Sequence, residues 1–399
     1  MPLRRYLFVL FAVVSITFFS CKEAPRDFNS NLLGPDQINL ITLDSFVANL
    51  SQSSNSFKTV VPLGSSYELL LGSYTSNSNN EQNASTLIQF DYSTISDSDK
   101  TNLLNGSISV IDSWIIFTKT YAFGDTSATQ IDFGAYKINT PWTSAGFTSD
   151  SLNNFSYNTN DLSGQKNFAN DSTNVYYIHI AGGTIQNQIA NYANGVQDYG
   201  LYLKPNTSDN TVWGFGAINS SYPPALAVVV NRGAALADTL YFNTLSDVSV
   251  LAGDLESSNS DIYVQPSLIG ESKLWFNVSL IPSDAIINQA KLKLTIDPSN
   301  TVNGTAYNSD LYIYNLSDST AKTIDSTLAP TSITSLDSTT YEGDITTIVQ
   351  KWVTNKKNQG MLLTPQGFFT GLDIFAFKGS NSPNVQQRPR LVILYTTRK

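Results

Sequence analysis

The chain of 399 residues contains a single cysteine, Cys21, and a single histidine, His179, and only 14% of its residues are charged. One residue of each type excludes a zinc site built from several Cys and His side chains, and it excludes a disulfide within the chain. The formal net charge is −9. A nucleic-acid partner is not expected, because neutralising phosphates requires clustered Lys and Arg.

Small uncharged polar residues are abundant, since Ser, Thr and Asn make up nearly a third of the chain. Such residues favour turns and strands over helix interiors. Hydrophobic residues reach 41% and aromatic residues 12%. This composition is typical of a folded chain and not of a disordered one. The length predicts two globular units.

The N-terminus has the organisation of an export signal. Arg4 and Arg5 precede an apolar stretch from Tyr6 to Phe19, which is too short to span a membrane. We therefore predict a signal peptide over residues 1–20. The segment Phe18-Phe19-Ser20-Cys21 resembles the lipobox of bacterial lipoproteins, although Leu is commoner than Phe at the first position. The resemblance implies cleavage before Cys21, lipidation of that residue and a membrane partner. An ordinary secretory signal with an incidental Cys remains the alternative.

Residues after the cysteine suggest a location. The Asp that retains Gram-negative lipoproteins at the inner membrane is absent from Lys22-Glu23, and Lys followed by an acid resembles part of a known surface-export signal. We predict lipid anchoring in the outer membrane with display at the cell surface, and the periplasmic face stays open. Polar residues over 21–37 predict a tether.

Strand signals dominate the rest of the chain. Segments such as 67–74, 108–118, 225–230 and 391–395 are short, rich in β-branched and aromatic residues and bounded by turn residues. The alternation in 291–296 is typical of a half-buried antiparallel strand. The sequence predicts an all-β protein of two tandem antiparallel β-sandwich, jelly-roll-like domains, each with one short helix.

The two predicted helices belong to an internal repeat. Ile185, Ile189 and Tyr192 have helical spacing, as do Ile345, Ile348, Val349 and Trp352, with Asp344 as N-cap. Residues 185–205 align with 345–365 at an offset of 160, and residues 87–90 align with 273–276 at an offset of 186. The first copy carries extra residues around 141–171. We predict one module over 38–235 and a second over 240–399.

The repeat resembles the DNRLRE family of β-sandwich modules related to carbohydrate-binding modules. The resemblance is carried by 345–352, Gly360-Met361-Leu362-Leu363, Phe377 and 388–392, with Asp44-Ser45-Phe46-Val47 resembling the opening strand. The N-terminal half also resembles a lipoprotein family of unknown function through 71–74, 111–114 and 121–125. These resemblances imply a fold, and a fold alone does not define an activity.

Candidate ligand contacts lie in the excursion around 141–171, because binding residues concentrate on loops. They are the aromatic residues Trp142, Phe147, Phe155 and Tyr157. The other tryptophans, which are Trp114, Trp213, Trp275 and Trp352, are predicted to pack in cores. His179 on a strand receives no role, and we predict no catalytic residue, metal site or cofactor. Six Asp-Ser/Thr motifs, including Asp318-Ser319-Thr320, resemble an O-glycosylation signal of some envelope proteins.

Three functions remain open at this stage. The first is a non-catalytic module that binds glycans or extracellular polymer. The second is a structural or adhesive envelope subunit that binds a protein partner. The third is a carboxylate-based polysaccharide hydrolase or lyase, which requires two convergent acids in a cleft.

Overall fold

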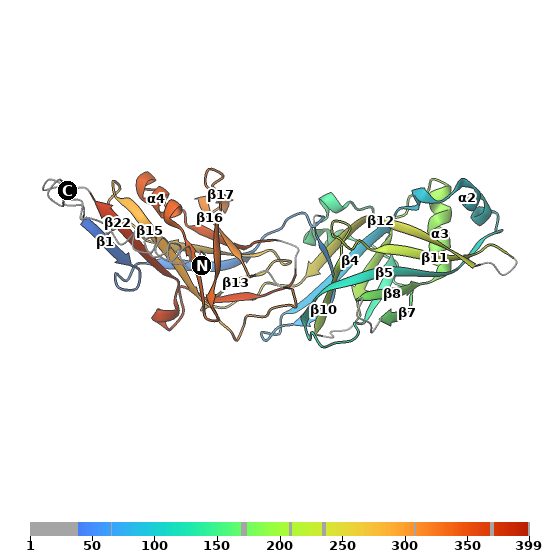
Figure 1. Cartoon of the computed structure of the whole chain (residues 1–399), viewed down its shortest axis with the longest axis horizontal. Coiled ribbons are helices and arrows are strands. Elements are labelled where there is room, and N and C mark those ends of the chain that lie inside the picture. The colour runs from blue at the N-terminus through green and yellow to red at the C-terminus, as the bar shows by residue number, and fades with distance from the viewer. Residues whose placement is uncertain are drawn as a thin grey trace, which may run out of the picture.

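The structure, a computed structural model, describes residues 39–64, 66–168, 174–206, 210–233, 237–306, 309–367 and 371–397. The predicted signal peptide, Cys21 and the tether over 21–37 lie outside the described residues. The protein is 47% strand and 13% helix. It forms two β-sandwich units placed end to end (Figure 1), which confirms the predicted fold class.

The chain is divided between the two units in an unexpected way. The inserted unit runs from β3 (Glu68–Thr75) to β12 (Ala237–Ala252), whereas the flanking unit joins β1 (Asn39–Asp44) and β2 (Gln52–Lys58) to the strands from β13 (Asp261–Val264) to β22 (Arg390–Thr397). This corrects the predicted boundaries at 38–235 and 240–399. The first two strands belong to the second sandwich, because β1 pairs with β22 and β2 pairs with β14.

The inserted unit holds a ten-stranded antiparallel sheet whose main order is β10-β3-β4-β12-β11-β5-β8-β7, with β9 pairing with β4 and β6. Its remaining elements are β4 (Glu81–Phe90), η1 (Tyr92–Thr94), α2 (Asp97–Leu104), β5 (Ser109–Gly124), β6 (Phe133–Lys137), η2 (Ser144–Gly146), η3 (Ser149–Asn154), β7 (Ser163–Phe168), β8 (Val175–Ile180), α3 (Gly182–Ala193), β9 (Leu201–Pro205), β10 (Thr211–Gly216) and β11 (Ala225–Asn231).

The flanking unit holds a ten-stranded sheet in the order β1-β22-β15-β19-β18-β16-β20-β14-β2, with β17 beside β16, and a separate pair β13-β21. Its remaining elements are β14 (Gly270–Phe276), β15 (Ile286–Thr295), β16 (Leu311–Asp318), β17 (Thr323–Ile324), β18 (Thr331–Asp337), β19 (Thr340–Asp344), α4 (Thr346–Asn355), β20 (Met361–Pro365), β21 (Phe375–Lys378) and η4 (Val385–Gln387).

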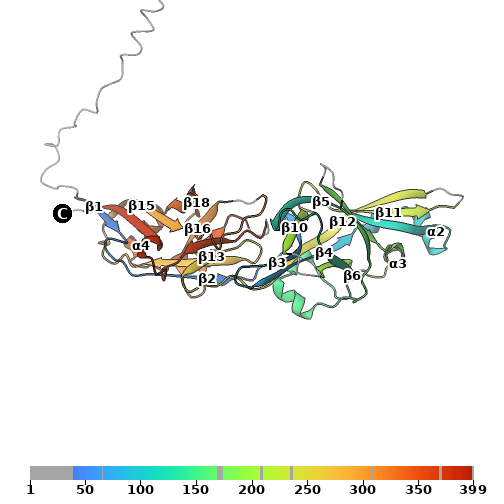
Figure 2. The same ribbon diagram turned by 90° about the horizontal axis from the view of Figure 1, so that it is seen from below.

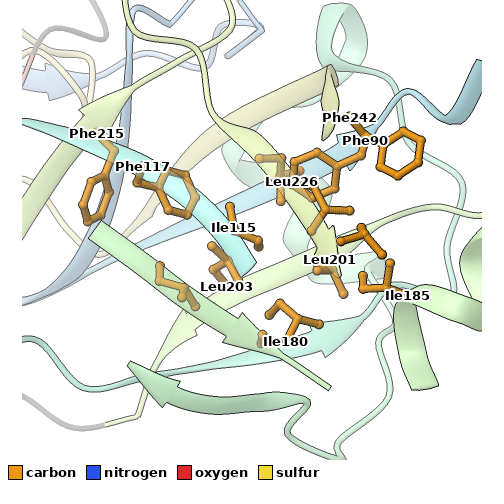
Figure 3. Packing of buried hydrophobic residues seen from close by; sticks show 14 of the residues in the cluster. Phe90, Ile115, Phe117, Ile180, Ile185, Leu201, Leu203, Phe215, Leu226 and Phe242 are labelled. Atoms are coloured by element: carbon orange, nitrogen blue, oxygen red, sulfur yellow. The ribbon is translucent and has the colours of Figure 1, made fainter. Parts of the chain in front are cut away.

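Each unit has its own hydrophobic core, and a third cluster lies between them. In the inserted unit, the inward residues Ile115, Phe117 and Leu226 of the neighbouring strands β5 and β11 belong to one buried cluster (Figure 3). The junction cluster combines Leu70 and Phe123 from the inserted unit with Ile374 from the flanking unit. Because these side chains are buried from both sides, the two units share a packed interface (Figure 2).

Both predicted helices form, as α3 and α4. The side chain of Asp344 accepts a hydrogen bond from the backbone N–H of Thr346 at 2.9 Å, in the first turn of α4, although the residue with cap geometry is Ile345. The inserted unit contains a second helix, α2. Its sequence has no apolar helical period, and the side chain of Ser96 caps it by accepting from the N–H of Asp99 at 3.1 Å.

The internal repeat is visible in backbone register. Ile88 pairs with Leu201 in β4 and β9, and Leu274 pairs with Met361 in β14 and β20, at the two offsets read from the sequence. Gly200 directly precedes β9 and has a φ of 78°, and Gly360 directly precedes β20 and has a φ of 86°. The two sandwiches therefore repeat the same turn and the same close strand approach.

Candidate functional site

The outer face of the inserted unit carries a row of aromatic residues, of which Tyr241 is exposed and Trp114 and His179 are half-buried. Direct neighbours across four strands are Tyr241 on β12, Ala227 on β11, Trp114 on β5 and His179 on β8. The inward faces of these strands form the core, so the row faces away from it. Tyr241 is 65% exposed. Ala227 lies between the strands that carry Tyr241 and Trp114 and is buried, and we call this set the aromatic row.

The aromatic row has a defined spacing. Tyr241 and Trp114 stand two strands apart, and adjacent strands are separated by about 4.8 Å, which places the two side chains about 10 Å apart. This is the length of a disaccharide in an extended chain. The flat faces of Trp and Tyr are suited to the apolar side of a sugar ring.

Polar groups flank the aromatic row on the same face. The neighbouring row on one side contains Thr239 and Asp112, and the row on the other side contains Asn243 and Tyr177. Tyr177 is 42% exposed. Hydroxyl, amide and carboxylate groups are the partners that fix the orientation of a polyhydroxylated ligand.

His179 is fixed within this face. Its Nε2 lies 2.7 Å from Oδ1 of Asp112, and its ring meets Trp114 edge-on with 5.0 Å between centroids. Nδ1 is buried without a hydrogen-bond partner, next to Gly164. One ring nitrogen is thus bonded and the other is enclosed, and the ring packs against Trp114.

The equivalent face of the flanking unit has different chemistry. Strand pairing places Asp44, Val392, Lys291 and Asp344 at the positions of Tyr241, Ala227, Trp114 and His179. Nζ of Lys291 lies 2.6 Å from Oε1 of Glu342. The pKa of Glu342 is lowered chiefly by its hydrogen bond to Lys291. The aromatic row therefore belongs to one copy of the repeat and is not a requirement of the fold.

The predicted ligand contacts of the excursion lie together, but they pack inward. Phe147 is buried, and Trp142, Phe155 and Tyr157 are half-buried against the sheet around Tyr202. Nε1 of Trp142 donates to the carbonyl of Tyr199 at 2.8 Å, and the rings of Phe155 and Tyr202 meet edge-on. The cluster covers the sandwich and presents no open row of rings.

The core prediction for the other tryptophans holds in part. Trp213 and Trp352 are buried, as predicted, whereas Trp114 and Trp275 are only half-buried. The prediction is wrong for Trp114, because the parity of β5 places it on the outer face. The signal that could have identified it is the alternation of Trp114 and Ile116 with the inward residues Ile115 and Phe117.

Two cavities occupy equivalent positions at the C-terminal ends of α3 and α4. The one in the inserted unit has a volume of about 230 Å³ and is lined by Gln89, Tyr192 and Asp198. The one in the flanking unit has a volume of about 450 Å³ and is lined at the corresponding positions by Trp275, Trp352 and Asn358. Asp198 and Asn358 both accept a hydrogen bond from the N–H of the following repeat glycine. The two cavities are thus part of the repeated helix-to-strand turn.

Acidic residues with raised pKa values lie in the junction and on β12. Burial raises the pKa of Glu68 to about 7, and the neighbouring Asp373 adds to the effect. Burial also raises the pKa of Asp373, whose Oδ1 accepts from the N–H of Gly304 at 2.6 Å. Neither acid lines either cavity described above.

Among the described residues, no group of three or more His, Cys, Asp or Glu side chains could hold a metal ion. No helix within the same residues is long and apolar enough to cross a membrane. The chain matches no protein-family model, no curated protein and no solved structure.

Proposed function

We propose that the protein is a lipid-anchored envelope protein that binds a glycan or extracellular polymer, without catalysis, on the aromatic row of the inserted unit. The observation that carries the proposal is the contrast between Tyr241 and Trp114 in one repeat and the charged Asp44 and Lys291 at the same positions in the other. A large aromatic exposed on a sheet face, as Tyr241 is, lowers solubility, so the presence of Tyr241 beside Trp114 in one copy favours a ligand.

The arrangement of the chain supports display of this face. β1, the first described strand, lies at the end of the flanking unit that is farthest from the inserted unit (Figures 1 and 2). An anchor at Cys21 would therefore attach beyond the flanking unit and leave the aromatic row on the distal sandwich. The resemblance to DNRLRE modules points to the same ligand class.

Truncation of the aromatic row is expected to abolish binding while the fold persists. Each aromatic at the centre of a contact contributes about 2 kcal/mol, or about 30-fold in Kd. We expect Trp114→Ala and Tyr241→Ala each to weaken binding to immobilised polysaccharides by about that factor. The probe is the soluble chain without residues 1–21 on an array of glucans, mannans, xylans, chitin and alginate.

The matched control is Lys291→Ala, which alters the equivalent position of the flanking unit. It is expected to bind like the parent chain. Circular dichroism should show that all three variants remain folded. The proposal is overturned if the parent binds none of these polymers, or if Lys291→Ala and Trp114→Ala reduce binding equally.

A further inference from the structure

Residues 39–58, which contain β1 and β2, close the flanking unit in the same way that β12 closes the inserted unit. In the inserted unit, β12 pairs with β11 along its first half and with β4 along its second half. In the flanking unit these two ladders are divided, since β1 pairs with β22 and β2 pairs with β14. We call residues 39–58 the closing segment.

Side-chain hydrogen bonds show that the equivalence is specific. The hydroxyl of Ser249 on β12 accepts from the N–H of Leu70 at 2.9 Å, and the hydroxyl of Ser56 on β2 accepts from the N–H of Tyr263 at 2.7 Å. Two residues earlier, Asp247 accepts from the N–H of Ile218 at 2.7 Å. At the corresponding place, Ser54 accepts from the N–H of Ser380 at 2.8 Å.

The two repeats have therefore exchanged closing strands. The closing segment comes before the inserted unit in the chain but completes the flanking unit. β12 comes directly before the later strands of the flanking unit but completes the inserted unit. β12 follows its partner β11 through a short connection. By contrast, the closing segment is joined to the rest of the flanking unit only through the whole inserted unit.

The closing segment is held by backbone pairing and by a few side chains, since Ile41 and Leu43 pack against the core of the flanking unit and Leu50 is buried. None of the residues within β1 and β2 is buried, whereas β12 contributes buried Phe242, Val248 and Val250. β1 and β2 also lie at the two ends of the strand order, so each makes a single ladder. Asp44 is one of its side-chain anchors and receives hydrogen bonds from the guanidinium of Arg390, besides the bonds accepted by Ser45, Ser54 and Ser56. An edge strand can leave its place and pair with another chain.

We propose that the closing segment of one copy completes the flanking unit of a second copy, so that the protein assembles by strand exchange. Every ladder and hydrogen bond of the closing segment is the same whether the segment comes from its own chain or from another. The ratio of closed monomer to strand-exchanged dimer is then set by two quantities. One is the effective concentration of the closing segment that the connection over residues 59–67 produces, and the other is the concentration of chains.

Strand exchange can be measured with single cysteines introduced into a chain that lacks residues 1–21. Removal of these residues also removes Cys21, the one cysteine of the sequence. Asn55 and Lys273 are direct partners across β2 and β14. Asn55→Cys and Lys273→Cys chains are mixed, unfolded, refolded together and oxidised. We expect a disulfide-linked heterodimer whose fraction rises with protein concentration. Thr42→Cys and Leu394→Cys, which pair across β1 and β22, are expected to behave alike.

The double variant Asn55→Cys/Lys273→Cys calibrates formation of the bond within one chain. Asn55→Cys mixed with Ser98→Cys, on the exposed face of α2, measures random oxidation. In native mixtures, Asp44→Asn is expected to speed heterodimer formation by weakening the anchor. The proposal is wrong if the double variant forms its disulfide within one chain while both mixtures of single variants give no more dimer than the Ser98→Cys mixture.

Discussion

Replacing Gly200 by Ala is expected to lower the free energy of unfolding by about 2–5 kcal/mol. The left-handed backbone costs an L-residue about 1–2 kcal/mol, and overpacking adds about 1–3 kcal/mol. A Cβ at Gly200 would lie 2.1 Å from the carbonyl oxygen of Ile88. Since that contact is backbone of the paired strand β4, relief requires displacing a strand. Urea denaturation at one pH measures the loss.

Two further glycines make this prediction sharp. Gly360→Ala places the Cβ 2.6 Å from the carbonyl oxygen of Leu274 and is expected to cost a similar amount in the flanking unit. Gly106 has a comparable φ of 76°, but a Cβ there meets nothing within 4 Å. Gly106→Ala should therefore cost only about 1–2 kcal/mol. Equal losses in all three variants would refute the close approach as the cause.

The sequence contained the repeat that these glycines belong to, because the offsets of 160 and 186 can be read from the residues alone. It did not show why a glycine is needed. The reason is tertiary, since Gly200 lies against the carbonyl of Ile88, and that residue is more than a hundred positions away. Fold class followed from local alternation, which is a property of neighbouring residues.

Strand partners were harder to predict, and the closing segment illustrates why. Its β2, Gln52–Lys58, has little of the β-branched and aromatic character that marks a strand. Its position is fixed by hydrogen bonds from Tyr263 and Ser380 to serine side chains. Tandem copies offer each such segment two equivalent places, and sequence order favoured the wrong one.

The candidate site, too, was only partly predictable from the sequence. The sequence predicted ligand contacts among the aromatic residues of the excursion, and the set around Trp142 packs against a sheet. Tyr241 and Trp114 are far apart in sequence and become neighbours across Ala227 only through the register of β12, β11 and β5. Side-chain parity predicts which way Trp114 faces, but it does not predict which residues join it.

The stability of the protein is expected to fall as the pH rises from 5 to 8. Burial raises the pKa of Glu68 from 4.5 to about 7 and that of Asp247 from 3.8 to about 6. Between those values the folded state retains protons that the unfolded chain has lost, so folding is favoured at the lower pH. The shift at Glu68 alone corresponds to on the order of 3 kcal/mol.

Acids with lowered pKa values act in the opposite direction, but only at lower pH. Hydrogen bonds from Arg390 and Arg232 hold the pKa of Asp44 and of Asp99 below its usual value. Both are ionised in the folded and unfolded states above about pH 5, so they add no slope there. Their contribution is lost on acidification, and maximal stability is therefore expected near pH 5.

Glu68→Gln tests the assignment. Oε2 of Glu68 is buried without a hydrogen-bond partner, and the carboxyl group is hydrogen-bonded to Thr120, a bond that the amide of Gln can also make, so the substitution chiefly removes the charge. The variant should lose the larger part of the decline between pH 5 and 8, and adding Asp247→Asn should remove most of the remainder, with the raised pKa of Asp373 contributing the rest. Glu81→Gln alters an exposed acid at the start of β4 and should follow the parent chain. If the free energy of unfolding of Glu68→Gln falls between pH 5 and 8 as much as that of the parent chain, Glu68 is not the group that retains the proton.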